Sequence, residues 1–314
     1  MISPRTVSTI TLTVSDAVQA TAFYTQALGA MVVDDRTLAA FGYGQLGVTA
    51  PSPVRMVTLR LGNEYIELIQ HLGVQSAPMP PDSRSHDLWF QHMAIVVSDM
   101  ELAHSHLSSF DIEPISEAPQ TIPADNPAAG GVRAFKFRDM DRHSLELIWF
   151  PADKIAPKWE HPGERLFLGI DHSAIAVSNT AKSIRFYQDI LGMEVVERSQ
   201  NSGTTQARLD GLPVAEVNIT SLRPQNGGMG IELLDYIQPE GGRSRPQSWQ
   251  IDDLSHRHLI LEVNDIHASL EILDYQNGVI VSPHVVKFPD HYRYGEGVLL
   301  KDPDDHVLLL IPSP

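Results

Sequence analysis

The segment Ile231-Glu232-Leu233-Leu234 decides the fold of this chain, because variants of it recur along the sequence. The variants are Ile66-Glu67-Leu68-Ile69, Leu145-Glu146-Leu147-Ile148 and Leu308-Leu309-Leu310-Ile311. Three of the four segments carry a glutamate in an otherwise apolar strand. Burying such a carboxylate without a partner would cost several kcal/mol, so each glutamate needs a partner, and a metal ion is the obvious one.

A second recurring element begins each unit. It is a strand-like run that ends in a helix-capping pair, and its copies are Thr9 to Asp16, His92 to Asp99, His172 to Asn179 and His258 to Asp265. The chain therefore consists of four modules of roughly 80 residues, a period typical of a structural repeat. Three of the four modules begin with histidine. Modules 1 and 3 resemble each other, as do modules 2 and 4, which indicates that a two-module ancestor was duplicated.

Each module has the same order of predicted elements. In module 1, residues 9–14 alternate as a half-buried strand, and Ser15-Asp16 caps a helix that Gly29 ends. The same order returns in module 3 with Ser178-Asn179 and Gly192. Three further strand-like runs follow each helix, so the unit is βαβββ and the fold class is α+β.

The composition limits the function. With 314 residues and 42% hydrophobic residues, the chain can form two domains with sizeable cores. It has no cysteine, so any metal must be bound by nitrogen and oxygen. A net charge of -16 disfavours a nucleic-acid partner. There is no long apolar run and no leader peptide, so we expect a cytoplasmic protein with no membrane partner. The sequence leaves open whether the chain forms a homodimer.

Taken together, these features resemble the vicinal oxygen chelate superfamily. The features are the four βαβββ modules, the histidine that opens the first strand, Phe-Tyr and Leu-Gly around the helix, an Asp-Pro-Asp-type turn and Ile-Glu-Leu at the end of the unit. The resemblance covers nearly the whole chain. The superfamily includes glyoxalase I, methylmalonyl-CoA epimerase, fosfomycin-resistance and bleomycin-binding proteins, and extradiol ring-cleaving dioxygenases. Such a fold alone says little about which reaction is catalysed.

In that superfamily, two modules curl into a cup and share one divalent metal. Each module offers its strand-one residue and its last-strand glutamate. The resemblance therefore implies four modules paired into two cup-shaped half-barrel domains. We favour pairing between neighbours, because short connections join elements that are adjacent in space. This places modules 1 and 2 at residues 1–152, a linker at 153–167, and modules 3 and 4 at 168–314.

The pairing decides which residues the resemblance implies as ligands. Neither Thr9 nor Leu309, at the ligand positions of modules 1 and 4, is a credible ligand. If neighbours pair, the metal site consists of His172, Glu232 and His258. If the middle modules pair, it consists of His92, Glu146, His172 and Glu232. Either set suits one divalent metal, which can be Fe, Mn, Zn, Ni or Co.

Other readings of these residues stay open. A single histidine at a strand end is more often a hydrogen-bonded core residue than a ligand, although three at the same repeat position argue against this. The glutamates can instead form ion pairs with Arg60, Arg208 or Arg223. His71 and His256 lie at even offsets from Glu67 and His258, so they face the same side of their strands and are alternative ligands.

The resemblance implies an enzyme that acts on a small-molecule substrate with vicinal oxygens. The leading prediction is a glyoxalase-like or epimerase-like lyase or isomerase with Glu232 as the base, and with Glu146 as its counterpart if the middle modules pair. One alternative is an extradiol Fe(II) dioxygenase. There, His291, the second predicted catalytic residue beside Glu232, and Asp302-Pro303 match the family spacing, but Leu299 and Leu309 occupy its tyrosine and glutamate positions. A second alternative is a non-catalytic protein that binds a small molecule of the antibiotic type.

Overall fold

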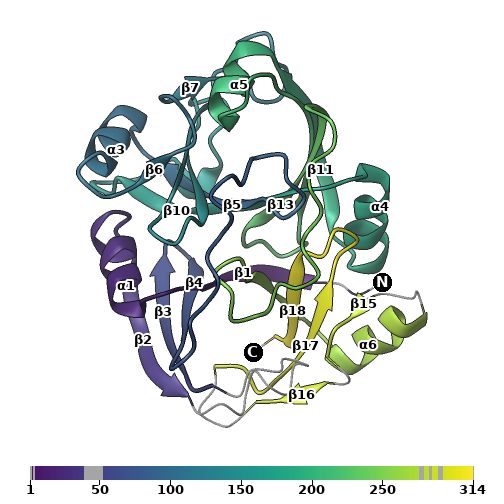
Figure 1. Ribbon diagram of the computed structural model, residues 1–314. Helices are drawn as coiled ribbons and strands as arrows, with labels where there is room; N and C mark the ends of the chain where they lie inside the picture. The colour runs from purple at the N-terminus through teal and green to yellow at the C-terminus, as the bar shows by residue number, and fades with distance from the viewer. Residues whose placement is uncertain are drawn as a thin grey trace.

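Two large β-sheets form the molecule, and helices pack against them at its sides (Figure 1). The computed structural model describes residues 2, 4–38, 52–275, 279–282, 285–288 and 293–313, without the side chains of residues 272–275 and 279–280. Within these ranges each sheet has nine strands. Both sheets are built from βαβββ modules, which confirms the predicted α+β class.

The first sheet combines modules 1 and 4, and we call it the 1–4 sheet. Its strand order is β15-β17-β18-β14-β1-β4-β3-β2, and β16 pairs with β17. Its strands are β1 (Pro4–Thr13), β2 (Met31–Leu38), β3 (Val54–Leu61), β4 (Glu64–His71), β14 (Arg257–Val263), β15 (Val279–Ile280), β16 (Val286–Lys287), β17 (Glu296–Lys301) and β18 (Val307–Pro312).

The second sheet combines modules 2 and 3, and we call it the 2–3 sheet. Its strand order is β11-β12-β13-β10-β5-β9-β8-β6, and β7 pairs with β8. Its strands are β5 (Gln91–Val97), β6 (Glu113–Pro114), β7 (Gln120–Thr121), β8 (Arg133–Arg138), β9 (Ser144–Trp149), β10 (Phe167–Ala176), β11 (Glu194–Ser202), β12 (Glu216–Arg223) and β13 (Gly230–Gln238).

One helical segment follows the first strand of each module. These segments are α1 (Ala17–Gln26), α3 (Met100–Leu107), α4 (Thr180–Ile184) with the π-helical turn η2 (Arg185–Ile190), and α6 (Ile266–Tyr275). The predicted caps are present: the Asp16 side chain accepts hydrogen bonds from the backbone of Val18 and Gln19, and Asn179 accepts one from Lys182. None of the described helices has the length and apolar content needed to cross a membrane.

The prediction that neighbouring modules pair is wrong. Strand β1 pairs antiparallel with β14, and β5 pairs antiparallel with β10, so module 1 joins module 4 and module 2 joins module 3. The connections between modules span residues 72–90, 150–166 and 239–256, and these lengths are nearly equal. Because no connection is clearly shorter than the others, the rule of short connections cannot choose between pairing of neighbouring modules and pairing of the middle modules.

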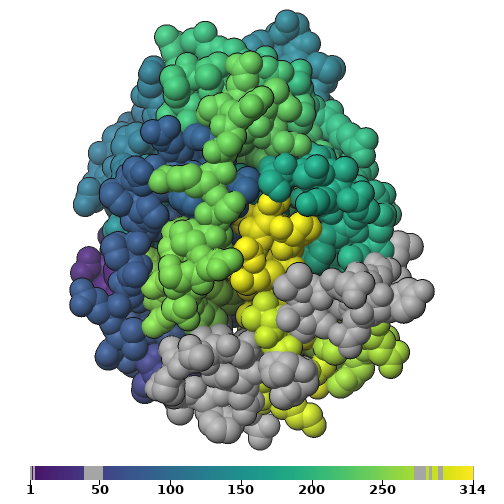
Figure 2. Space-filling view, turned by 45° about the vertical axis from the view of Figure 1, so that its right-hand side comes forward, coloured from purple at the N-terminus to yellow at the C-terminus, as the bar shows by residue number. Residues whose placement is uncertain are grey.

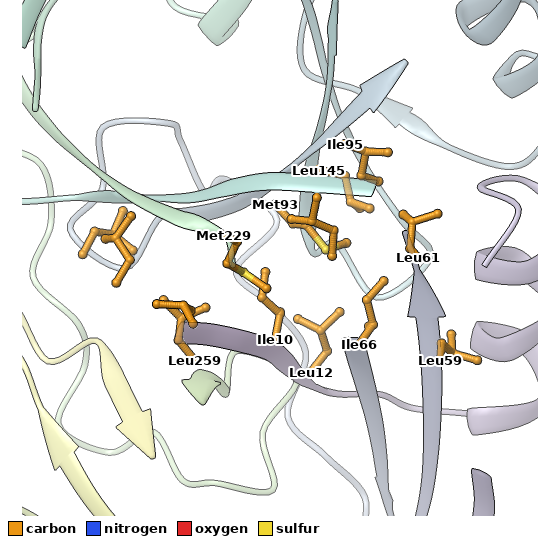
Figure 3. Packing of buried hydrophobic residues seen from close by; sticks show 14 of the residues in the cluster. Ile10, Leu12, Leu59, Leu61, Ile66, Met93, Ile95, Leu145, Met229 and Leu259 are labelled. Atoms are coloured by element: carbon orange, nitrogen blue, oxygen red, sulfur yellow. The ribbon is translucent and has the colours of Figure 1, made fainter. Parts of the chain in front are cut away.

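The two sheets pack against each other through one shared hydrophobic core. Figure 3 shows Met93 and Leu145 of the 2–3 sheet facing Leu12 and Ile66 of the 1–4 sheet. Successive side chains of a strand point to opposite faces, so the neighbours of these core residues point away from the shared core. Each sheet therefore presents its second face to a separate cup, and these two cups hold the polar residues singled out above.

A short helix inside module 3 departs from the predicted βαβββ order. Helix α5 (Gly203–Asp210) lies between β11 and β12 and ends at Gly211, whose φ of 62° is left-handed. A Cβ atom at Gly211 would also lie 2.6 Å from the backbone oxygen of Ile115, so the position requires glycine. Gly211 is the sequence signal that could have revealed this helix.

Candidate metal centre

Four strands of the 2–3 sheet bring one polar side chain each to the floor of its cup. His92 lies on β5, Glu146 on β9, His172 on β10 and Glu232 on β13. In the antiparallel register of β5 and β10, His92 lies opposite Ala174 and His172 lies opposite Ala94. A small side chain therefore faces each imidazole across the strand pair and leaves room for it. The ligand set that follows from pairing of the middle modules is the set that the structure assembles.

The four side chains form a chain of close contacts from His92 through Glu146 and His172 to Glu232. His92 Nε2 is 2.9 Å from Glu146 Oε2, and His172 Nε2 is 3.8 Å from the same oxygen. His172 Nε2 is also 3.3 Å from Glu232 Oε2. The potential ligand atoms of His92, Glu146 and His172 all lie within 4.8 Å of one another, and all three residues are buried.

His92 has ring nitrogens that the described residues do not satisfy. Its Nε2 is close to Glu146, but the two groups are not aligned as a hydrogen bond, and its Nδ1 has no hydrogen-bond partner among the described residues. A buried polar atom without a partner is costly, and a cation between Nε2 and the carboxylate would satisfy both groups. The nitrogen and oxygen donors present here fit a divalent cation of the Fe, Mn, Zn, Ni or Co type.

Asp171 holds the second imidazole in place. Its Oδ2 is 2.9 Å from His172 Nδ1 and also accepts a hydrogen bond of 2.8 Å from Arg223 Nη2. Burial disfavours the charged form, but the bond to His172 and the charge of Arg223 outweigh it and hold the Asp171 pKa well below its usual range. Asp171 thereby turns His172 Nε2 toward the two glutamates. A carboxylate behind a histidine ligand fixes its orientation and tautomer.

Replacing Asp171 with asparagine is expected to weaken metal binding by about 10- to 100-fold, because the imidazole loses its anionic partner. The affinity is measured by competition with a chelator. Asp139→Asn is the matched control, because Asp139 is an equally buried carboxylate bonded to a histidine, His143, away from the cup. An equal loss of affinity in both variants would contradict the orienting role of Asp171.

The charges of the cup are tightly coupled. Burial works against the ionised form of Glu146, yet His92, Lys136 and His172 together lower its pKa to about 2. Burial lowers the pKa of His92, which favours the neutral ring that a metal requires. The pKa of His172 is raised, because the attraction of Glu232, Asp171 and Glu146 exceeds the effect of burial.

A buried lysine stands beside the two glutamates. Lys136 lies opposite Glu146 in the register of β8 and β9, and its Nζ is 2.7 Å from Asp210 Oδ1 at the end of α5. Gln206 donates a second hydrogen bond to Asp210. Burial disfavours the charge on Lys136, but the carboxylates of Asp210, Glu146 and Glu232 raise its pKa. Sequence reasoning missed this pair, because neither residue recurs in the repeat.

The cup opens into a cavity of about 440 Å³. The metal-centre residues, Lys136 and Arg223 line its polar side, and apolar side chains of both modules and of α5 line the rest, namely Ile122, Val132, Ala134, Ile148, Leu209 and Leu234. This volume lies within the range of small-molecule sites, about 300–1,000 Å³.

The other predicted site residues lie elsewhere. His258 is on β14 of the 1–4 sheet, so the triad of His172, Glu232 and His258 is not assembled. The reason is the module pairing described above. His291, the predicted second catalytic residue, lies outside the described residues. Arg223 pairs with Asp171 and Arg208 with Glu117. Across the described ranges, neither these two arginines nor Arg60 pairs with a last-strand glutamate.

The cup of the 1–4 sheet differs from its counterpart because a cluster of apolar side chains lines it. The cluster there consists of Leu38, Val54, Met56, Ile69, Ile251, Ile260, Val286, Phe288, Tyr294, Leu299, Val307, Leu309 and Ile311. His71 and His256 bond to Ser52 and to His258, at 3.1 and 3.2 Å. Burial lowers the pKa of His258 to about 3. No metal-binding group of three or more residues is found among the described residues of this sheet.

Glu67 is the one last-strand glutamate that faces this apolar cup. It accepts a hydrogen bond of 2.7 Å from Tyr294 and a longer one from Thr11. Burial raises the Glu67 pKa, and the opposing bonds and the charge of Arg293 compensate only in part. Because the folded-state pKa lies above the unfolded value, Glu67 favours folding most at acid pH, and this contribution is lost as the pH rises through the folded-state pKa.

Replacing Glu67 with glutamine is therefore expected to stabilise the protein at pH 7 to 8 and to have little effect near pH 4. The amide still accepts the bond from Tyr294 but carries no charge to bury. Urea unfolding of both proteins across this pH range measures the difference in the free energy of unfolding. If the stabilisation does not change with pH, the buried charge of Glu67 is not its cause.

Comparison with known proteins agrees with this architecture. The model of the Glyoxalase/Bleomycin resistance protein/Dioxygenase superfamily matches residues 6–147 and 169–310. No curated protein sequence matches the chain. Glyoxalase I from Zea mays is similar in structure, with a TM-score of 0.67 at 16% identity over 98% of this chain and 92% of that one. A putative dioxygenase from Bacillus subtilis subsp. subtilis str. 168 has a TM-score of 0.58 at 14% identity, over 100% and 87%.

At these identities the similar structures share the fold, and the match of the family model to both halves of the sequence carries the assignment. The repeated last-strand glutamates, the histidines that open the first strands and the two cups all agree with it. The chain belongs to the Glyoxalase/Bleomycin resistance protein/Dioxygenase superfamily.

Proposed function

We propose that this chain is a divalent-metal-dependent enzyme that moves a proton on a small substrate with two neighbouring oxygens, in the manner of a glyoxalase or an epimerase. The observation that carries the proposal is the convergence of the buried His92, Glu146 and His172 with the partly exposed Glu232, two residues from each of two modules, at the floor of a cavity. Histidines and carboxylates that converge at the floor of a cavity are typical of a metal site.

His92, His172 and Glu146 would hold the metal, with Glu232 completing the set. When bound, a divalent cation supplies Lewis-acid chemistry that stabilises negative charge on the oxygens of a substrate. Asp171 keeps His172 oriented for binding, and Lys136 offsets the negative charge of the two glutamates. The apolar side chains of the wall lower the local polarity, which strengthens each of these electrostatic interactions.

Glu232 is the better candidate for the residue that moves the proton. Glu146 is held by His92 and by the charge of Lys136, and its pKa of about 2 makes it a weak base. Glu232 is more accessible, with a side chain 20% exposed, and one of its oxygens accepts a bond of 2.7 Å from Ser221. The other oxygen faces the centre of the site, where it can accept a proton from a carbon next to the bound oxygens.

A second candidate function is oxidative ring cleavage. The three ligand atoms that lie within 4.8 Å of one another come from two histidines and one carboxylate, a set typical of non-haem Fe(II) oxygenases. In this case Glu232 would act on the hydroxyl groups of a catechol and would not bind the metal. The two functions differ in whether molecular oxygen is consumed.

The test begins with elemental analysis of the purified protein. The metal-free protein is then loaded separately with Fe(II), Mn, Zn, Ni and Co. Each form is assayed for exchange of a carbon-bound proton with deuterated solvent on α-hydroxycarbonyl compounds, and for oxygen uptake with catechols. Proton exchange without oxygen uptake supports the proposal. Oxygen uptake with Fe(II) supports ring cleavage, and bound ligand without turnover in any form supports a binding protein.

Glu232→Gln tests the base while His92, His172 and Glu146 stay in place to hold the metal. We expect this variant to keep its metal and to lose about 10²- to 10⁴-fold in the rate of proton exchange, because the amide cannot accept the proton. Ser221→Ala is the control, since it removes only the neighbouring hydroxyl that bonds to Glu232. Unchanged exchange in Glu232→Gln would exclude Glu232 as the base.

A further inference from the structure

A second cavity lies on the other side of the molecule, over the module 4 half of the 1–4 sheet. It has a volume of about 360 Å³ and lies between β17 and β18 and the connector that precedes β14. Figure 2 shows this connector as a green column of atoms beside the yellow atoms of the last strands. We call residues 245–251 of the connector the strap. No residue of the candidate metal centre lines this cavity.

The strap contributes a guanidinium to the cavity wall. Arg245 forms no ion pair with any residue that the structure describes, and its Cζ lies 5.5 Å from the centre of the Trp249 ring, which holds it in place. Burial lowers the Arg245 pKa, and the more distant charges of Asp305 and Asp253 compensate only in part. An arginine in this position is short of an anionic partner.

The charges around the cavity leave room for one anion. Lys301 is the other lysine or arginine among the lining residues, and its Nζ is 3.1 Å from Asp305 Oδ1, so these two charges offset each other. His256 also lines the cavity, and its pKa is far below the ordinary value because of burial and the neighbouring cationic groups, so its ring is neutral. The positive charge of Arg245 remains, and a monoanion would neutralise it.

The rest of the wall combines two amide side chains, Gln247 and Gln250, with apolar and aromatic side chains. Trp249 and Ile251 contribute from the strap, and Val281, Leu299 and Val307 contribute from module 4. A few polar groups among apolar and aromatic side chains are typical of sites for small organic ligands, and the volume falls in their range of about 300–1,000 Å³.

We propose that this cavity, bounded by Arg245, Trp249, Leu299 and Val307, binds a small organic carboxylate. The carboxylate forms the fork-to-fork pair with the Arg245 guanidinium, and the apolar body of the ligand lies against Trp249 and the side chains of β17 and β18. A carboxylate fits better than a phosphate monoester, because one unpaired cationic side chain matches one negative charge. The site is separate from the proposed metal chemistry, so either proposal can fail without the other.

The experiment uses benzoate and hexanoate as probes and the full chain as the protein. Isothermal titration calorimetry is carried out on the wild type and on Arg245→Gln, and Trp249 fluorescence reports binding at the strap. We expect Arg245→Gln to lower the affinity for both probes by about tenfold or more, and Arg245→Lys to recover part of it. Benzyl alcohol, which lacks the charge, is expected to bind as weakly to the wild type as to Arg245→Gln.

Two further variants locate the binding. Arg84→Gln is the matched control, because Arg84 is an exposed arginine in the connector between modules 1 and 2, and it should bind both probes like the wild type. His92→Gln changes the metal centre and should also keep the wild-type affinity. Equal affinity of Arg245→Gln and the wild type, loss of binding only in His92→Gln, or no binding of either probe at millimolar concentration overturns the proposal.

Discussion

Replacing His172 with alanine is expected to abolish both stoichiometric metal binding and turnover. His172 is the residue that links the two halves of the candidate centre, with its Nε2 3.8 Å from Glu146 and 3.3 Å from Glu232. Its loss leaves a single imidazole and two carboxylates, and only Lys136 then offsets the repulsion between these carboxylates. The metal content is measured by elemental analysis after gel filtration, and turnover is measured by proton exchange in the same preparation.

His258→Gln is the control that makes this result specific. His258 opens module 4 as His172 opens module 3, and it is equally buried, but it lies in the other sheet. The variant should keep one metal per chain. If His258→Gln loses the metal as His172→Ala does, the metal is bound by His172, Glu232 and His258, the set expected from pairing of neighbouring modules. If His172→Ala keeps full occupancy, the site lies elsewhere.

The second large effect concerns stability. Asp210→Ala is expected to lower the free energy of unfolding by about 3 kcal/mol or more, because it leaves the charge of Lys136 in the interior without its nearest partner. The side chains of Lys136 and Asp210 are 4% and 0% exposed, and their charged atoms are 2.7 Å apart. Urea unfolding monitored by circular dichroism measures the loss.

Asp35→Ala provides the comparison, since Asp35 forms an ion pair of the same length, 2.7 Å, with Arg55 but is 41% exposed. It should cost no more than about 1 kcal/mol. The double variant Lys136→Met with Asp210→Leu should recover most of the stability lost in Asp210→Ala, because it removes both charges together. Equal losses in Asp210→Ala and Asp35→Ala would mean that water reaches the buried pair.

The sequence predicted much of the fold because the fold is repeated. A single strand with a glutamate, such as residues 231–234, is ambiguous, but four copies at matched positions identify the unit and its strand order. The helix caps at Asp16 and Asn179 were predictable for a local reason, since a capping side chain acts on backbone groups within three residues of itself. The same repeat pointed to His172 and Glu232.

The pairing of the modules was not predictable in this way. The pairing depends on which two modules join through the edges of their first strands. These first strands, β1, β5, β10 and β14, are similar and apolar, and their pairing leaves no local pattern in the sequence. The residues that support the site were hidden for a different reason. None of these residues recurs at the matching position of another module. They are Asp171 on β10, Lys136 on β8 and Asp210 on α5. Their roles depend on three-dimensional packing that no spacing in the sequence encodes.

The joining of the first module to the last has a consequence for how the chain matures on the ribosome. The strands of the 2–3 sheet are complete once Gln238 has emerged, so this sheet can close while the rest is still being translated. Strand β1 was made long before, yet its partner β14 begins only at Arg257. Throughout that interval the nascent chain carries an open sheet edge, the kind of surface on which strands of separate polypeptides associate.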